Sequence, residues 1–160
     1  MTSVKIYTDG SCNAKSRLGG YGVYIVTPKD EIVLRQGYSN TTTARMEMRA
    51  ILTALRAITT TVAVDVLIVS DSQFIVNAFH KRWLNKWRLN GWVGVANADL
   101  WRAIVREISL HPQMRLRLRW FRGHQDDSIV DSESAYGNVV ADALADYKTQ
   151  DNYIVDKDEM

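Results

Sequence analysis

The sequence has little of several features that would place a protein in a special class. Its single cysteine, Cys12, excludes an internal disulfide bond and favours a reducing environment. No apolar run has the length needed to cross a membrane, and residues 1–3 lack the basic and apolar regions of a signal peptide. We therefore expect a cytoplasmic protein with no membrane partner.

An excess of one charge is also lacking, because 20 lysine and arginine residues nearly balance 18 aspartate and glutamate residues. The resulting net charge of +2 does not by itself indicate a nucleic-acid partner. The distribution of charge is more informative. Basic residues concentrate between positions 81 and 122, whereas acidic residues collect at 126–133 and 151–159. This segregation suits a surface that binds a polyanion.

The periodicity of the apolar residues predicts one α/β domain over residues 1–150, followed by a flexible acidic tail over 151–160. Three strands with short connections come first and indicate an antiparallel meander. The later strand–helix–strand connections require right-handed crossovers, which add parallel strands. The expected elements are strands at 4–8, 20–26 and 31–38, a helix at 43–58, a strand at 62–70, a helix after 72, a helix at 99–110, a strand at 114–120 and a helix from 134.

Two acids stand where core strands are expected to end. Asp9 follows the first strand, and Gly10 after it allows a sharp turn or the close approach of another backbone. Asp71 follows the buried strand at 62–70. Ligand sites in such sheets form outside the carboxyl ends of parallel strands. The same residues also have simpler interpretations, because Asp-Gly is a common turn and Asp71 can cap the next helix.

Two helices are expected to add carboxylates at their inner edges. Glu47 borders the buried stripe of the helix at 43–58, and Asp142 lies on the edge of the last helix. Glu47 could instead be an acid favoured by the helix dipole in the first turn, and Asp142 could be a solvated helix acid. Four carboxylates in one small site require a cation, and oxygen ligands favour Mg²⁺ or Mn²⁺ over Zn²⁺. Two such ions could hold the attacking water and the leaving oxygen of a phosphodiester.

Five short motifs, taken in order, resemble type 1 ribonuclease H. They are Thr8-Asp9-Gly10-Ser11, Arg45-Met46-Glu47, Ser70-Asp71-Ser72-Gln73, Gly123-His124 and the run from Asn138 to Ala145. The resemblance implies a ribonuclease H-like fold in the order βββαβαβα, with a five-stranded mixed sheet between helices on both faces. It also implies an endoribonuclease that hydrolyses the RNA strand of RNA·DNA hybrids and leaves 3′-hydroxyl and 5′-phosphate ends.

The resemblance assigns roles to individual residues. The metal ligands would be Asp9, Glu47, Asp71 and Asp142, which would hold two Mg²⁺ ions, with Mn²⁺ as a substitute. His124 would be a further catalytic residue that assists proton transfer or product release. The residues expected to contact nucleic acid are Gly10, Ser11, Thr42, Arg45, Gln73, Lys81, Arg82, Trp83, Lys86, Asn97 and Asn138. We expect the protein to act as a monomer on an RNA–DNA hybrid.

Parts of the substrate site follow the family pattern. The segment from Trp83 to Trp92, where tryptophans alternate with basic residues, resembles the protrusion that grips the DNA strand. Thr42 and Asn97 match positions that hold a DNA phosphate, and Gln73 matches a minor-groove contact. The strand at 114–120 carries arginines on one face that we expect to be solvated or ion-paired: Arg115, Arg117 and Arg119.

Other parts depart from the family pattern. Thr43 and Ala44 stand where the family has asparagines, which leaves fewer side chains to read the 2′-hydroxyl groups of RNA. The loop at 125–136 is longer and more acidic than the family's. Its acids are alternatives to Asp142 as a metal ligand, although a helix would hold Asp142 more firmly. These loop acids are Asp126, Asp127 and Asp131.

Two alternative functions fit the same fold. A non-catalytic module that binds hybrids would account for the tryptophan-rich basic segment. It would gain nothing from four clustered acids that face phosphates. A relative that acts on DNA is a second alternative, but the Asp9-Gly10-Ser11 and Asp71-Ser72-Gln73 motifs favour ribonuclease activity.

Overall fold

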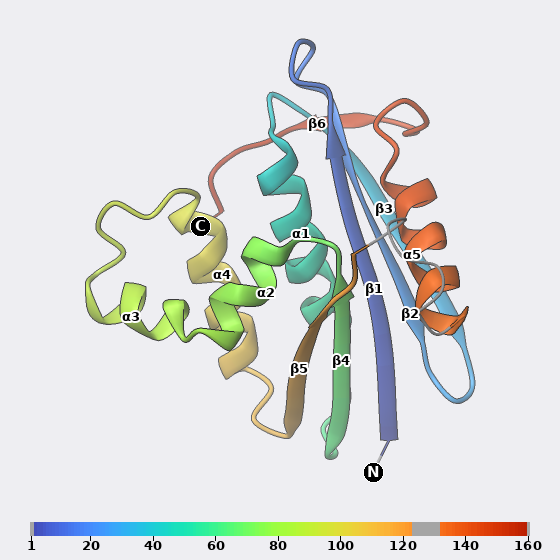
Figure 1. Cartoon of the computed structure of the whole chain (residues 1–160), viewed down its shortest axis with the longest axis vertical. Coiled ribbons are helices and arrows are strands. Elements are labelled where there is room, and N and C mark those ends of the chain that lie inside the picture. The colour runs from blue at the N-terminus through green and yellow to red at the C-terminus, as the bar shows by residue number, and fades with distance from the viewer. Residues whose placement is uncertain (1, 123–131, 160) are drawn as a thin grey trace.

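The computed structural model describes residues 2–122 and 132–159, and it shows a six-stranded mixed sheet (Figure 1). The strands are β1 (Thr2–Cys12), β2 (Gly19–Val26), β3 (Glu31–Ser39), β4 (Val64–Ser70), β5 (Met114–Trp120) and β6 (Tyr153–Val155). Their spatial order is β5-β4-β1-β2-β3-β6. The first three strands pair antiparallel, whereas β4 and β5 extend the sheet in parallel. The predicted fold class is therefore confirmed, with six strands rather than five.

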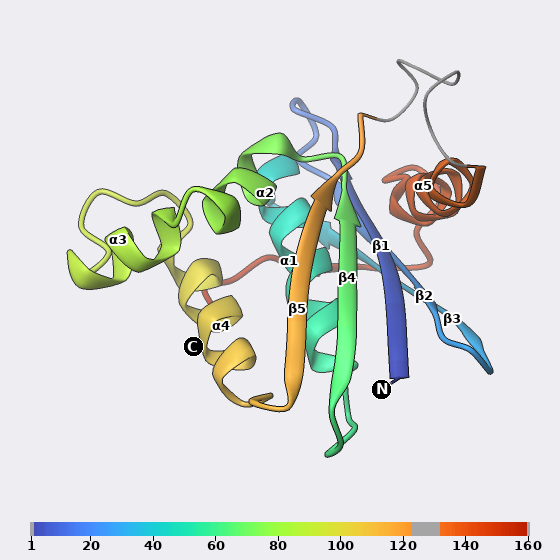
Figure 2. The same ribbon diagram turned by 60° about the horizontal axis from the view of Figure 1, so that its bottom comes forward.

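Helices cover both faces of this sheet. They are α1 (Thr43–Arg56), α2 (Gln73–His80), α3 (Trp83–Leu89), α4 (Ala98–Ser109) and α5 (Ser132–Ala145). On one face α1 packs on β1 and β2 with α4 behind it, and α5 packs on the opposite face (Figures 1 and 2). None of the helices in the described residues is both long and apolar enough to cross a membrane.

Alternation along the strands builds a core on each face. In β1, Ile6 is fully buried on the α1 side, and the next residue, Tyr7, packs on the α5 side with Val69 of β4. Side chains cap the first two helices, because Thr42 Oγ1 accepts a hydrogen bond from the Arg45 amide and Ser72 does the same for α2. These caps set where α1 and α2 begin, next to the ends of the core strands.

Several element boundaries differ by a few residues from the sequence-based prediction, and two of them concern elements that carry predicted metal ligands. β1 does not end before Asp9 but continues to Cys12, because β2 still pairs with it through Gly19–Cys12. The last helix begins at Ser132 rather than near Ser134, so residues 132–136 of the predicted acidic loop are helical. The rest of that loop, 125–131, lies outside the described residues.

The C-terminal segment adds a strand where a flexible tail was expected. Tyr153–Val155 forms β6, which pairs in parallel with the last residues of β3. Asp156 follows and is 8% exposed. Thr41 Oγ1 donates a hydrogen bond to it at 2.6 Å, and Arg49 donates another at 2.6 Å. Because these partners lie 115 and 107 positions earlier, no local pattern in the tail reveals them.

Asp156 joins the tail to the start of α1 through two arginines. Its carboxylate accepts from Arg45 Nε at 2.9 Å as well as from Arg49. Burial alone opposes ionisation of Asp156, but hydrogen bonds from Arg45, Thr41 and Arg49 hold its pKa below the usual value. These ion pairs therefore hold the C-terminal segment against α1.

Replacing Asp156 with asparagine should lower the free energy of unfolding by about 3 kcal/mol, because Arg45 and Arg49 would keep their charges without a buried counter-ion. Since the pKa of Asp156 is lowered by folding, its contribution is present at neutral pH and is lost as the pH falls below about 4. Thermal unfolding of both proteins at neutral pH and below pH 4 measures the change in stability. Asp158→Asn, an exposed position in the same segment, is the matched control, and equal Tm values for the two variants would refute the role of Asp156.

Candidate active site

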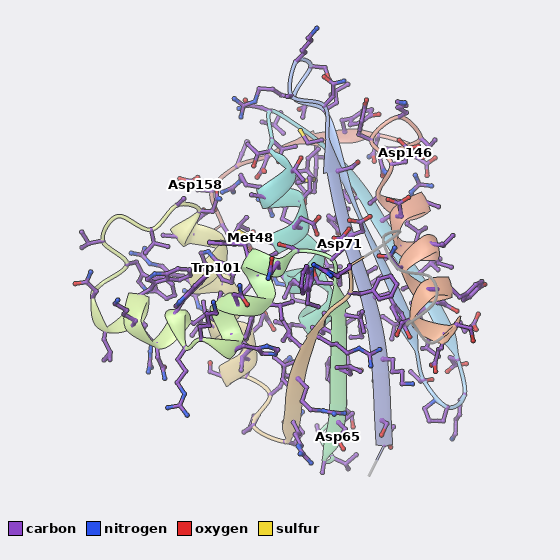
Figure 3. All side chains as sticks on the ribbon, viewed as in Figure 1. Met48, Asp65, Asp71, Trp101, Asp146 and Asp158 are labelled. Carbon is purple, nitrogen blue, oxygen red and sulfur yellow. The ribbon has the colours of Figure 1, made fainter. Side chains whose placement is uncertain are left out.

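Three carboxylates meet at the carboxyl end of β4. The ligand atoms of Asp9, Glu47 and Asp71 lie within 4.8 Å of one another. The register explains two of them, because β4 pairs with β1 only as far as Ser70 opposite Thr8. Asp9 is thus the first residue of β1 beyond its parallel neighbour, and Asp71 is the first residue after β4. Figure 3 shows Asp71 at this end of the strand.

A close contact at Gly10 places Glu47 beside Asp9. A Cβ atom at this position would lie 2.4 Å from the Glu47 amide nitrogen and 2.6 Å from the Met46 carbonyl carbon. Any side chain here would therefore push α1 away from β1. The Gly10 amide also donates a hydrogen bond to Asp9 Oδ1 at 2.8 Å, which orients that carboxylate. Glycine thus positions two of the three acids.

Close contacts on the opposite face bring α5 to the same place. A Cβ at Gly22 of β2 would lie 2.4 Å from the carbonyl oxygen of Ala141, and a Cβ at Gly137 would meet the Tyr7 ring at 2.4 Å. Asp142 follows Ala141 on the exposed side of α5. It lies outside the group of three, but its proximity contributes to raising the pKa of Asp9.

Burial and mutual repulsion make this cluster reluctant to ionise. Burial, followed by the charge of Asp71, raises the pKa of Asp9 to about 8. Burial and then the charges of Asp9 and Asp71 raise the pKa of Glu47 well above its usual value. The pKa of Asp71 is also raised, mainly by burial. Full ionisation near neutral pH therefore needs a compensating positive charge.

The donor set fits a divalent metal ion. The three groups offer only carboxylate oxygens, which suit Mg²⁺ or Mn²⁺. Glu47 Oε2 is buried and has no hydrogen-bond partner among the described residues. A buried acceptor without a donor is costly, and a bound cation would satisfy it. The cluster can thus hold hard cations at the edge of a solvent-accessible site.

Arg45 contacts Thr42 and Asn97, which are predicted to bind a DNA phosphate, and also Asp156 of the C-terminal segment. Its guanidinium is occupied by Asp99 at 2.9 and 3.0 Å and by Asp156. Its Nη1 also donates to Asn97 Oδ1 at 3.2 Å, and its amide donates to Thr42 Oγ1 at 3.2 Å. These contacts favour a supporting role for Arg45, whose predicted contact with nucleic acid stays a prediction. They leave the Asn97 amide group and the Thr42 hydroxyl hydrogen available as donors.

The sequence analysis did not single out Asp99 or Asp156. Asp99 has a recognisable local signal, because it is an acid in the first turn of α4. Its partnership with Arg45 holds its pKa at about 2. Asp156 has no such signal, since its role depends on contacts with α1.

A cavity of about 610 Å³ opens beside these donors, between α1, α2, α3 and the loop before α4. Its lining includes Ser72, Lys86, Trp87 and Asn97. Trp87 also packs against Trp101, with ring centres 5.6 Å apart. Part of the tryptophan-rich segment therefore anchors the wall of the cavity, and its basic residues remain on the surface.

The other predicted nucleic-acid contacts fall into exposed and buried groups. Exposed positions flank the ends of α2, and they are Gln73, Lys81 and Arg82. Trp83 is partly buried against Phe74, with ring centres 5.7 Å apart. Gly10 and Asn138 are buried. The Ser11 hydroxyl forms hydrogen bonds with the end of α5 and the turn after it. Ser11 Oγ donates to the Ala145 carbonyl at 2.6 Å and accepts from the Tyr147 amide at 3.0 Å.

Some predicted site residues lie outside the described part of the chain. His124 is one of them, so its catalytic role stays a prediction. The alternative metal ligands of the loop also lie outside the described residues, and they are Asp126, Asp127 and Asp131.

Comparisons with known proteins agree with the geometry. The family model described as RNase H matches residues 1–150. Ribonuclease H of Pseudoalteromonas atlantica is 36% identical over 129 residues, which are 78% of this chain and 80% of that protein. Ribonuclease HI of Vibrio vulnificus is 38% identical over 126 residues, which are 76% of this chain and 77% of that protein.

Two solved structures share the fold. LC9-RNase H1, described as a type 1 RNase H with the type 2 active-site motif, superposes with a TM-score of 0.72 at 28% identity, covering 91% of this chain and 71% of that chain. The protease-reverse transcriptase of prototype foamy virus superposes with a TM-score of 0.70 at 25% identity, covering 91% of this chain and 20% of that one.

Replacing Asp9 with asparagine should stabilise the metal-free protein at pH 8, by up to about 5 kcal/mol, since each unit of pKa difference is worth about 1.4 kcal/mol. Because the pKa of Asp9 is about 8 in the folded protein and about 4 in the unfolded chain, its ionisation destabilises the fold progressively as the pH rises between these values. The advantage of the variant should therefore shrink towards pH 5. Thermal unfolding in a chelating buffer measures the difference at each pH.

The same experiment with Mg²⁺ tests the metal site. The ion should raise the Tm of the unmodified protein and have a much smaller effect on Asp9→Asn. Asp158→Asn is the control, because it removes one acid away from the cluster. A Mg²⁺-induced shift of equal size in Asp9→Asn would argue against binding at these carboxylates.

Proposed function

The chain belongs to the RNase H family. We propose that it hydrolyses the RNA strand of RNA·DNA hybrids at the cluster of Asp9, Glu47 and Asp71. The observation that carries the proposal is the convergence of three carboxylates with raised pKa values, one of which has a buried oxygen, Glu47 Oε2, with no hydrogen-bond partner among the described residues. The proposed cofactor is a pair of Mg²⁺ ions, with Mn²⁺ as a substitute. The products would carry 3′-hydroxyl and 5′-phosphate ends.

The cluster would perform this reaction through metal ions held by its carboxylates. Divalent ions bound here would supply the charge that activates a water molecule and stabilises the departing 3′-oxygen. Asp9 would be the shared ligand, because it interacts with Glu47 and Asp71 and also with Asp142. Asp142 would complete the shell from α5. The close contact at Gly10 and the hydrogen bond to Asp9 would keep the ligands in place during the reaction.

The cavity beside the cluster supports a path for the DNA strand. Thr42 and Asn97 would donate hydrogen bonds to a DNA phosphate, since Arg45 holds the acceptor atom of each side chain. The surface cations of the α2–α3 region would contact neighbouring phosphates, and these are Lys81, Arg82 and Lys86.

The RNA strand would be recognised beside the acids. Gln73 is exposed at the start of α2, where it can reach the minor groove of the hybrid. Thr43 and Ala44 would contribute little to reading the 2′-hydroxyl groups. His124 would assist proton transfer or product release. We further propose that the protein acts as a monomer, because one chain supplies all the carboxylates of the cluster.

Cleavage of an end-labelled RNA·DNA hybrid with Mg²⁺ tests the proposal. Asp71→Asn should lower the rate by about 100-fold or more, because it removes a metal ligand from a site that acts by charge stabilisation. Asp158→Asn, an exposed position of the C-terminal segment away from the cluster, should retain the rate (Figure 3). Chelation of the metal should abolish cleavage, and the product ends can be identified by enzymatic labelling.

Other results of the same assay would favour one of the alternative functions. Equal rates for Asp71→Asn and the unmodified protein would remove the catalytic role of the cluster. Strong, salt-dependent binding of the hybrid without cleavage in Mg²⁺ or Mn²⁺ would indicate a non-catalytic module instead. Comparable cleavage of a DNA duplex would indicate a nuclease that acts on DNA.

A further inference from the structure

Arginine side chains line an open strip of the sheet. In the edge strand β5, Leu116 and Leu118 pack toward the core beneath α1 and α4. Alternation therefore directs Arg115, Arg117 and Arg119 to the opposite face, where all three are exposed. On that face α5 packs mainly on β1 and β2, and Figure 2 shows it on the β1 side of the sheet, away from β5. We call these three residues the β5 arginine face.

This surface shares a sheet face with the acid cluster. In the sheet register, Arg119 of β5 lies opposite Val69 of β4, and Val69 lies opposite Tyr7 of β1. Tyr7 and Asp9 are two residues apart in β1 and so point to the same side. The end of β5 also contacts the site directly, because Trp120 Nε1 donates a hydrogen bond to the Asp71 carbonyl at 3.2 Å. The row of arginines therefore begins beside Asp71 and leads away from it.

Among the described residues, two of the three charges are weakly paired or have no partner. Arg117 forms no hydrogen bond or ion pair with any described residue. Arg115 approaches Asp65 only at 3.8 Å with 72% of its side chain exposed, and such surface pairs are weak. Arg119 differs, since it donates a hydrogen bond to Ser134. The nearby Lys5 is also engaged, by Glu133 at 3.0 Å. Arg115 and Arg117 thus supply the net positive charge of the strip.

We propose that the β5 arginine face binds the phosphate backbone of unpaired RNA that continues from the strand held at the acid cluster. The proposal rests on the proposed function, which places an RNA strand there. Alternate residues of a strand are about 6.6 Å apart, which is close to the separation of successive phosphates in one nucleic-acid strand. A single row of cations also matches one backbone better than the two backbones of a duplex.

Binding of labelled hybrids measured by fluorescence anisotropy tests this proposal. The measurements use the Asp71→Asn protein with Mg²⁺, so that the RNA is not cleaved. The hybrids are blunt or carry a single-stranded RNA extension at the 5′ or the 3′ end. One of the two extensions should tighten binding by roughly two- to tenfold, the effect expected for two exposed charge pairs. The end that responds gives the direction of the strand.

A double variant, Arg115→Gln with Arg117→Gln, should abolish this gain and leave the affinity for blunt hybrid unchanged. It should also lower the slope of log affinity against log salt for the extended hybrid by about 1.4. The control is Arg102→Gln with Arg106→Gln, which removes two exposed charges from α4 and should retain the gain. Thermal unfolding verifies that both double variants are folded.

Three outcomes would overturn the inference. They are an absence of any gain from either extension, an equal loss of affinity for blunt and extended hybrids in the β5 variant, and an equal loss in the α4 control. A fourth outcome is separate, because failure of the parent protein to bind or cleave any hybrid would refute the proposed function itself.

Discussion

The contact between α1 and β1 at Gly10 is the constraint on which the site depends. Without a Cβ atom at this position, the helix backbone approaches the strand closely enough to bring Glu47 against Asp9. The strand register then adds Asp71, because β4 stops one residue before it. Backbone packing thus holds together three carboxylates that repel one another. The raised pKa values are the electrostatic consequence of this packing.

Much of this arrangement was predictable because its signals are local. Apolar runs identify the core strand that carries Asp9 and the one that Asp71 follows, and Glu47 lies on the edge of an amphipathic helix. The order of elements then brings these ends to one edge of the sheet. What the pattern could not supply was the distance between them. That distance depends on how closely α1 and α5 pack, which only the glycine contacts in the folded protein reveal.

Contacts between distant segments were the part that sequence reasoning missed. A strand of three residues is too short for a periodic signal, and Asp156 is recognisable only beside Arg45 and Arg49. The ion pairs of Arg45 with Asp99 and Asp156 were missed for the same reason, because they join segments that are far apart in the sequence. Alternation did predict exposed arginines on β5, but it could not show which part of that face α5 would leave open.

Folding also changes how the charge of the chain acts on a polyanion. An acidic tail that was free in solution would repel RNA and DNA. In the folded protein, Asp156 and Glu159 are instead paired with arginines of α1, so their negative charge is largely compensated. The arginines of α1 are neutralised by the same pairs, whereas the exposed cations of the α2–α3 region, and Arg115 and Arg117 of β5, form no ion pair closer than 3.8 Å with any described residue. These two regions flank the acid cluster, so a chain of nearly zero net charge still presents positive surface where a nucleic-acid backbone would enter and leave.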